Sequence, residues 1–276
     1  MTDTSRQPTF IIAGAMRCRT TRVNVYLREH PEIEVSTPKE VHFFDLHFDK
    51  GLDWYEEHFP GSGTASAIGE ATPDYLYDPV VPERIAATLP EVKIVLLLRD
   101  PVERARSHYW HNRSRNREDL EFLEALQSES ERVKVDREGW DRFSYVDRGL
   151  YGEQLARLYE HVPPDRVLVQ TFDDLESEPG IVFRRTCEFL GVDPGFVPDN
   201  LGRAVNAYVR FRSMWLRDAT RDLPRPLRNA IARLNRIEQD RYAPITPQAR
   251  RYIRDRTRAD NATAEKLAGV EMPWVS

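Results

Sequence analysis

The chain has 276 residues, of which 40% are hydrophobic and 31% charged, a composition typical of a globular protein that can bury a sizeable core. No apolar run approaches the roughly 20 residues that span a bilayer, and the polar start lacks a signal peptide's apolar region. Two cysteines, Cys18 and Cys187, are too few for a disulfide framework or a four-thiolate zinc site. These features exclude a disordered chain and predict a cytoplasmic protein without a membrane segment.

The net charge of −5 is unevenly distributed along the chain. Between Arg203 and Arg258 there are 15 arginines and five acidic residues, so this stretch carries a charge of +10. Such a stretch either faces a nucleotide, an acidic substrate, a nucleic acid or a membrane surface, or lines solvated helix faces.

Strands and helices alternate in the predicted structure of the first two thirds of the chain. Short buried apolar runs predict strands at 9–13, 67–70, 93–98 and 166–171. Helical spacing, with proline and glycine at the ends, predicts helices at 23–30, 82–89, 101–112, 152–161 and 178–190. This alternation favours an α/β fold with a mostly parallel sheet that has helices on both faces.

The remaining segments carry weaker patterns. Residues 120–141 predict a helix plus a mobile loop, and no strand is predicted beyond Gly191. Residues 217–268 are predicted to be mainly helical, with Thr246 as N-cap of a late helix. We expect one domain of residues 1–276, with an α/β core at 9–200 and a mainly helical part at 201–276.

The turn after the first strand is the first candidate site. Backbone N–H groups from Arg17 to Thr21 precede a helix, and such a turn favours an anion. Arg17 adds a forked cation, and Thr20 and Thr21 add hydroxyl donors. The alternative is an ordinary turn with a threonine cap. The turn lacks the Gly-Lys-Ser/Thr of a Walker A loop, which disfavours ATP with magnesium.

A second candidate site follows the strand at 93–98. Arg99 stands at the carboxyl end of this strand, and Ser107 lies about two helical turns later on the same face as Glu103. An arginine and a serine in this arrangement suit a second phosphate. The equally weighted alternative is an ion pair of Arg99 with Asp100 or Glu103.

A third segment, Pro38–Asp45, combines Glu40, His42 and Asp45 with two adjacent phenylalanines. An apolar floor can desolvate a carboxylate and raise its pKa toward the range of a general base. The alternative is a surface loop that Phe43 and Phe44 anchor.

These segments together resemble the sulfotransferases that use 3′-phosphoadenosine 5′-phosphosulfate (PAPS), especially the heparan-sulfate-type group and its bacterial small-molecule relatives. Each motif alone is weakly specific, but their order and spacing together indicate the family. The resemblance implies a P-loop-like three-layer α/β fold. The matching segments are 10–21, Lys39–Asp45, Gly69–Tyr75, Leu97–Tyr109, Arg148–Tyr151, Phe189–Asp193 and 260–274.

The resemblance also implies roles for particular residues. Arg99 and Ser107 would bind the 3′-phosphate, while the 5′-phosphosulfate would be held by Arg17, Cys18, Arg19, Thr20 and Thr21. Glu40 would act as the general base, with Arg17 stabilising charge and His42 and Asp45 positioning the acceptor or tuning Glu40. In-line transfer to an acceptor hydroxyl would leave 3′-phosphoadenosine 5′-phosphate (PAP), and no metal is needed in that scheme.

Three residues depart from the family pattern. Arg17 stands where lysine is usual, and it keeps the charge but cannot donate a proton at neutral pH. Arg19 stands where glycine is usual; if that position needs a positive φ, the arginine costs about 1 kcal/mol or more. Ala71 replaces a lysine common in the heparan enzymes, which favours a small hydroxylated acceptor over a polyanionic glycan.

Three other interpretations remain. A non-catalytic protein that binds PAPS or PAP could have lost turnover through Arg17 and Arg19. A P-loop kinase would need Gly-Lys-Ser/Thr and a strand that ends in aspartate, whereas this strand leads into Arg99. A nucleic-acid binder would need exposed aromatic side chains among its arginines, but Tyr208, Phe211 and Trp215 have the spacing of a helix core. The sequence indicates neither a nucleic-acid partner nor an oligomeric state.

Overall fold

The computed structural model describes residues 7–61, 63, 65–202, 210–211, 216, 219–220, 224–237 and 243–275. The chain divides into two compact units, of which the first comprises residues 1–101, 150–203 and 257–276. The second comprises residues 102–149 and 204–256. The second unit therefore interrupts the α/β core expected at 9–200, and the single domain of residues 1–276 stays a prediction.

Five parallel strands form the sheet of the first unit, in the order β2-β3-β1-β4-β5. The four strands expected from buried apolar runs are confirmed, and all five run in the direction expected of an α/β fold. The unexpected strand is β2, whose three residues, with Glu34 in the middle, are too short to form an apolar run. The strands are β1 (Phe10–Gly14), β2 (Ile33–Val35), β3 (Ala67–Glu70), β4 (Lys93–Leu98) and β5 (Val167–Thr171).

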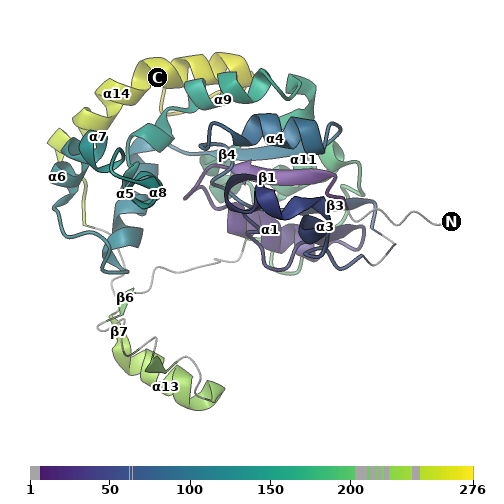
Figure 1. Ribbon diagram of the computed structural model, residues 1–276, viewed down its shortest axis with the longest axis horizontal. Coiled ribbons are helices and arrows are strands. Elements are labelled where there is room, and N and C mark those ends of the chain that lie inside the picture. The colour runs from purple at the N-terminus through teal and green to yellow at the C-terminus, as the bar shows by residue number, and fades with distance from the viewer. Residues whose placement is uncertain are drawn as a thin grey trace. The chain divides into compact units, whose positions relative to one another are not determined.

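Helices flank this sheet, as predicted (Figure 1). Gly191, with a φ of 82°, ends α11 in the left-handed conformation that glycine tolerates. No helix in the described part of the chain is long and apolar enough to cross a membrane. The helices of this unit are α1 (Thr20–Arg28), α2 (Phe43–Leu46), α3 (Gly51–Glu56), α4 (Val81–Thr88), α9 (Tyr151–Tyr159), α10 (Phe172–Ser177) and α11 (Pro179–Leu190), with the short 3-10 turns 48–50 and 164–166.

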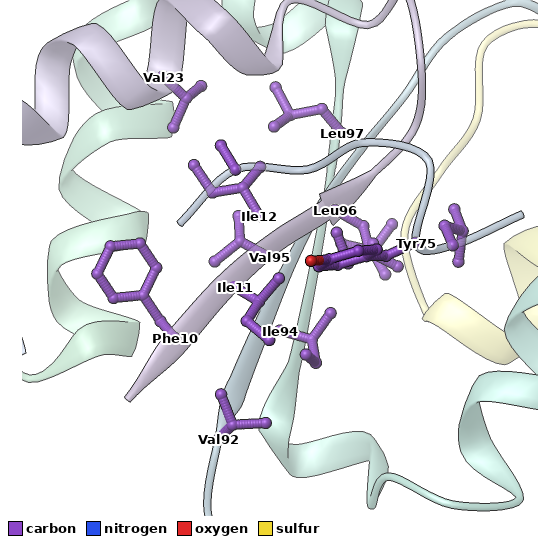
Figure 2. Packing of buried hydrophobic residues seen from close by; sticks show 14 of the residues in the cluster. Phe10, Ile11, Ile12, Val23, Tyr75, Val92, Ile94, Val95, Leu96 and Leu97 are labelled. Carbon is purple, nitrogen blue, oxygen red and sulfur yellow. The ribbon is translucent and has the colours of Figure 1, made fainter. Parts of the chain in front are cut away.

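The core of the first unit is centred on the two middle strands. All five residues of β1 and five of the six in β4 are buried. Figure 2 shows Phe10, Ile11 and Ile12 of β1 packed among the β4 side chains, with Val23 of α1 and Tyr75 nearby. Each fully buried aliphatic side chain contributes about 1.5–3 kcal/mol to folding. These buried residues therefore stabilise the sheet from whose edge the turns extend.

The C-terminal half of α14 (Pro247–Ala268) lies beside α9 (Figure 1). The Asp260 carboxylate accepts hydrogen bonds from the N–H groups of Gly152 (2.8 Å) and Glu153 (2.9 Å), and so caps α9. A Cβ atom on Gly152 would lie 2.4 Å from the Asp260 carbonyl oxygen, so only glycine fits there. The indole N–H of Trp274 donates to Asn261 (2.9 Å). The closing motif therefore stabilises the first unit.

The second unit is mainly helical, as expected of its C-terminal segment. Its core joins α5 and the segment 120–146 to the first half of α14. The Thr246 hydroxyl accepts a hydrogen bond from the Ala249 N–H (3.2 Å), which confirms the predicted N-cap. The helices are α5 (Pro101–Arg113), α6 (Phe122–Gln127), α7 (Glu129–Arg132), α8 (Arg137–Phe143), α13 (Arg225–Asn235) and the first half of α14, with a 3-10 turn at 147–149.

Two expectations about this unit are wrong. The segment 120–141 contains three short helices rather than one helix and a loop. Two buried carboxylates hold these helices in place. Glu118 binds Arg132 (2.8 Å), and Glu129 accepts hydrogen bonds from the N–H groups of Val146 (2.7 Å) and Asp147 (2.9 Å). A two-stranded ladder of β6 (Arg210–Phe211) and β7 (Arg236–Ile237) lies beyond Gly191, and strands of two residues show no sequence pattern. Tyr208 and Trp215 lie outside the described residues.

Candidate active site at the carboxyl edge of the sheet

The sheet brings three of the sequence-predicted segments to one edge. Because β3, β1 and β4 are parallel neighbours, their carboxyl ends meet there. The turn 15–19 follows β1, Glu70 ends β3, and Arg99 follows β4. Phe172 follows β5 directly, next to Arg99, because Leu98 pairs with Thr171 in the sheet register.

The turn after β1 has an unusual backbone. Arg17 (φ 72°) and Arg19 (φ 66°) both adopt the left-handed conformation, and α1 begins at Thr20 without an acidic residue in its first turn. The Cys18 side chain is fully buried, and its N–H donates to the Ala15 carbonyl (3.2 Å), so Cys18 supports the turn from inside. Thr20 is buried and Thr21 half-buried. A helix N-terminus next to an arginine favours the binding of an anion, so this turn could still hold one.

Arg19 stands where the resembling family usually has glycine, and its φ of 66° meets the condition under which the arginine would be strained. Its Nε atom lies 3.3 Å from Glu176 Oε1, and its guanidinium lies 5.8 Å from the centre of the Phe172 ring. Arg22 binds the same Glu176 oxygen at 2.7 Å. Glu176 of α10 thus anchors the start of α1 through two arginines.

The backbone strain at Arg19 can be measured with two variants. Both Arg19→Ala and Arg19→Gly remove the ion pair to Glu176. Its two side chains are about one-third exposed, so the pair contributes at most about 1 kcal/mol to stability. Only glycine relieves the left-handed strain, so the free energy of unfolding of Arg19→Gly should be about 1 kcal/mol higher than that of Arg19→Ala. Urea unfolding of the two variants measures this difference. Equal midpoints would show that the turn imposes no strain on Arg19.

The resemblance implies that Arg19 contacts the nucleotide, whereas the structure shows an ion pair with Glu176, and PAP binding to Arg19→Gly tests which role applies. If Arg19 acts only as a tether to Glu176, PAP affinity in Arg19→Gly should equal or exceed that of the unmodified protein. A clear loss of affinity in calorimetric titration would instead make Arg19 a nucleotide-binding residue.

Arg99 links the end of β4 to the turn after β1. Its guanidinium stacks 4.0 Å from the centre of the Phe172 ring, and Nη1 donates to the Arg17 carbonyl oxygen (3.3 Å). The Tyr151 hydroxyl donates to the Arg99 carbonyl (2.9 Å). The alternative partner Glu103 binds Arg106 (3.0 Å) and Arg250 (3.4 Å) in the second unit. Ser107 is buried on α5, also in the second unit.

The structure brings Glu40, His42 and Asp45 together. Lys39 Nζ lies 2.7 Å from one Glu40 oxygen, and His42 Nε2 lies 3.9 Å from the other. His42 Nδ1 lies 2.8 Å from Asp45, whose side chain is only 2% exposed. The Glu40 side chain is 43% exposed, because Phe43 and Phe44 pack into the core and do not cover it. The expected desolvation of Glu40 by these two rings is therefore wrong.

The pKa of His42 is shifted by its neighbours. Burial lowers its pKa, but the hydrogen bond and charge of Asp45, together with the charges of Asp74 and Glu40, outweigh burial and raise the pKa to about 9. His42 is therefore a cation at neutral pH. An imidazolium cannot accept a proton, so at neutral pH His42 is no candidate for the general base.

This raised pKa makes the stability contributed by His42 depend on pH. The folded-state pKa of about 9 exceeds the ordinary 6.5, so the contribution is full below pH 6.5 and is lost as pH rises through 9. Thermal unfolding of the wild type and of His42→Gln should therefore differ most at pH 6 and converge near pH 10. A difference that stays constant over this range would contradict the assignment of a charged His42.

One buried cluster lies in the segment Gly69–Tyr75, which the resemblance includes but to which it assigns no role. Glu70 is fully buried, and it accepts hydrogen bonds from the hydroxyls of Tyr55 (2.6 Å), Thr72 (2.6 Å) and Tyr75 (2.9 Å). Burial raises its pKa, although these hydrogen bonds oppose the shift. The signal available was a carboxylate at the end of a buried strand with hydroxyl residues two and five positions later. Within the described residues, no three His, Cys, Asp or Glu side chains are grouped to hold a metal ion.

The chain is similar to known proteins in sequence and in fold. Residues 7–214 match the model of the sulfotransferase domain family. The chain is 32% identical over 185 residues to mouse heparan sulfate glucosamine 3-O-sulfotransferase 3B1, which covers 67% of this chain and 46% of that protein. It is 41% identical over 105 residues to the membrane-associated sulfotransferase kil1 of Dictyostelium discoideum, covering 37% of this chain and 22% of that protein. The chain thus spans less than half of these curated relatives.

Solved structures give matches over nearly the whole chain. A sulfotransferase from Alicyclobacillus acidocaldarius superposes with a TM-score of 0.75 at 28% identity, over 96% of this chain and 97% of that one. A mouse sulfotransferase complexed with PAP shares the fold, with a TM-score of 0.53 at 15% identity over 96% of this chain and 90% of that one. The matched domain model, the heparan sulfate relatives and this agreement of fold together show that the chain belongs to the sulfotransferase family.

Proposed function

We propose that this protein transfers a sulfuryl group from PAPS to a hydroxyl group of an acceptor. One observation carries the proposal: adjacent parallel strands hold Arg17, Arg99 and the anchor of the Glu40 segment at a single edge of the sheet. Such an edge offers cations for a nucleotide with two phosphate-bearing ends and a carboxylate for a proton.

The residues present fit such a nucleotide. Arg17 and the N-terminus of α1 suit the 5′-phosphosulfate, because an arginine fork and helix N–H groups both favour an anion. Arg99 suits the 3′-phosphate, since its stacking on Phe172 leaves a planar guanidinium that can bind phosphate through two parallel hydrogen bonds. The family resemblance assigns Ser107 to the same phosphate, and this stays a prediction because Ser107 belongs to the second unit.

The cluster at 40–45 suits the transfer of the acceptor proton. Glu40 is the accessible carboxylate, whereas Asp45 is buried against His42. As the acceptor oxygen bonds to sulfur and the bond from sulfur to the bridging phosphate oxygen breaks, Glu40 takes the hydroxyl proton. The His42 cation stabilises the negative charge of Glu40 and of the reacting oxygens, and Asp45 fixes the orientation of the imidazole. PAPS supplies the sulfuryl group when bound.

The acceptor that we propose is a small hydroxylated molecule. Ala71 is fully buried where a lysine would add a cation, and the chain outside Arg203–Arg258 is acidic. Both features disfavour a polyanion at this edge. Glycans remain the alternative acceptors, because the curated relatives named for heparan sulfate match two thirds of the chain.

Two measurements test this function. Calorimetric titration should show PAP binding much more tightly than ATP, and equal or tighter ATP binding would favour a kinase. Radiolabelled PAPS should then transfer its sulfuryl group to at least one member of a panel of phenols, alcohols and amines. Tight PAP binding without any transfer would favour a non-catalytic nucleotide-binding protein. The loss of turnover would then be attributed to Arg17 and Arg19, which both adopt the left-handed conformation.

A further inference from the structure

Four consecutive backbone N–H groups of the Glu40 segment donate to side chains of the segment 70–75. The Val41 N–H donates to Thr72 Oγ1 (3.2 Å) and Glu70 Oε2 (3.3 Å), and the His42 N–H donates to Thr72 Oγ1 (3.4 Å). The N–H groups of Phe43 (2.8 Å) and Phe44 (3.3 Å) both donate to the Tyr75 hydroxyl. The segment 70–75 therefore caps the first turn of α2 from outside the helix.

This cap matters because α2 cannot cap itself. Its N-cap residue, His42, has a φ of 56° and makes no capping hydrogen bond with its own side chain. A left-handed conformation is unfavourable for a residue with a Cβ atom, and the first N–H groups of a helix need acceptors. The hydroxyls of Thr72 and Tyr75 supply these acceptors for the N–H groups of His42 and its neighbours.

Glu70 determines which way these hydroxyls face. A hydroxyl has one proton to donate and two lone pairs that accept. Both Thr72 and Tyr75 donate their proton to the buried Glu70 carboxylate, so their lone pairs are left for the N–H groups of 41–44. A backbone N–H can only donate, so the oxygens of Thr72 and Tyr75 accept from residues 41–44 and their protons are left for Glu70.

We propose that Glu70, Thr72 and Tyr75 are positioning residues for the sulfuryl transfer proposed above. They hold the backbone of residues 41–44 in the conformation that places His42 beside Glu40 and Asp45. The proposal rests on the proposed function, and none of the three residues needs to contact substrate.

The chain offers a matched pair of tyrosines for the test. Both Tyr55 and Tyr75 are buried and donate to Glu70 Oε1, but only Tyr75 accepts from the Phe43 and Phe44 N–H groups. Tyr75→Phe should lower kcat by about ten- to a hundredfold with the best acceptor of the panel, because small misplacements of reacting groups are costly. Tyr55→Phe should stay within about threefold of the wild type, and PAP affinity should be unchanged in both.

Thr72 adds a second pair with the same logic. Thr72→Val keeps the shape but removes the acceptor for two N–H groups and should lower kcat, whereas Thr72→Ser keeps the hydroxyl and should restore it. A loss of kcat shared equally by Tyr55→Phe and Tyr75→Phe would overturn the proposal, as would full activity in Thr72→Val.

Amide hydrogen exchange gives a readout that needs no acceptor. The N–H groups of Phe43 and Phe44 should exchange faster in Tyr75→Phe than in Tyr55→Phe, and equal exchange would overturn the proposed cap. If the wild type transfers no sulfuryl group, the proposed function fails, and the exchange comparison alone decides whether 70–75 holds 41–44.

Discussion

Glu40→Gln is expected to reduce turnover by about 10²–10⁴-fold, the usual contribution of a general base. The amide keeps the shape of the side chain but cannot take the acceptor proton, and the protonated His42 cannot replace it at neutral pH. PAP affinity should not change, because the carboxylate acts on the acceptor. Turnover is measured with radiolabelled PAPS and affinity by calorimetry.

Two comparisons make this result specific. Glu57→Gln changes an exposed glutamate after α3 in the same way and should leave turnover unchanged. If Glu40→Gln retained full turnover, Asp45 would have to act as the base despite its burial against His42.

Arg99→Ala is expected to weaken PAP binding at least tenfold, since a lost charge-assisted contact typically costs about 1.5–3 kcal/mol. AMP lacks the 3′-phosphate, so its affinity serves as an internal control and should change far less. Arg99→Lys keeps the charge but loses the planar stack on Phe172. Its PAP affinity should therefore lie between that of the unmodified protein and that of Arg99→Ala. Similar affinities of the unmodified protein for PAP and AMP would remove Arg99 from 3′-phosphate binding.

The sequence predicts those parts of the fold that local patterns encode. The strands β1 and β4 are continuous apolar runs next to turn residues, and α11 ends at a glycine, so each is recognisable from its own residues. By contrast, β2 has three residues with Glu34 in the middle. An edge strand this short takes its conformation from pairing with β3, which no local pattern reveals.

The candidate site divides in the same way. Glu40, His42 and Asp45 lie within six residues and could be predicted as a group, and the family's usual glycine at Arg19 raised the question of a positive φ there. The partners of this turn could not be predicted, because Glu176 lies 154 positions beyond Arg22. Glu70 stands in the matching segment Gly69–Tyr75, but its burial and its hydrogen bonds from Tyr55, Thr72 and Tyr75 could not be predicted, because Tyr55 comes from a different segment. The sequence does not show whether a charged side chain is exposed to solvent or buried among hydrogen-bond donors in the tertiary structure.

The cap that Asp260 places on α9 has a consequence for protein synthesis. Ala264 and Met272 are buried in the core of the first unit, and Asp260 holds the N–H groups of Gly152 and Glu153. The ribosome adds these residues after every strand of the sheet, so the nascent α/β unit exposes part of its core until they emerge. A chain stalled while residues 260–272 are still inside the ribosome should therefore keep this part of its core exposed, whereas a chain in which these residues have emerged should close.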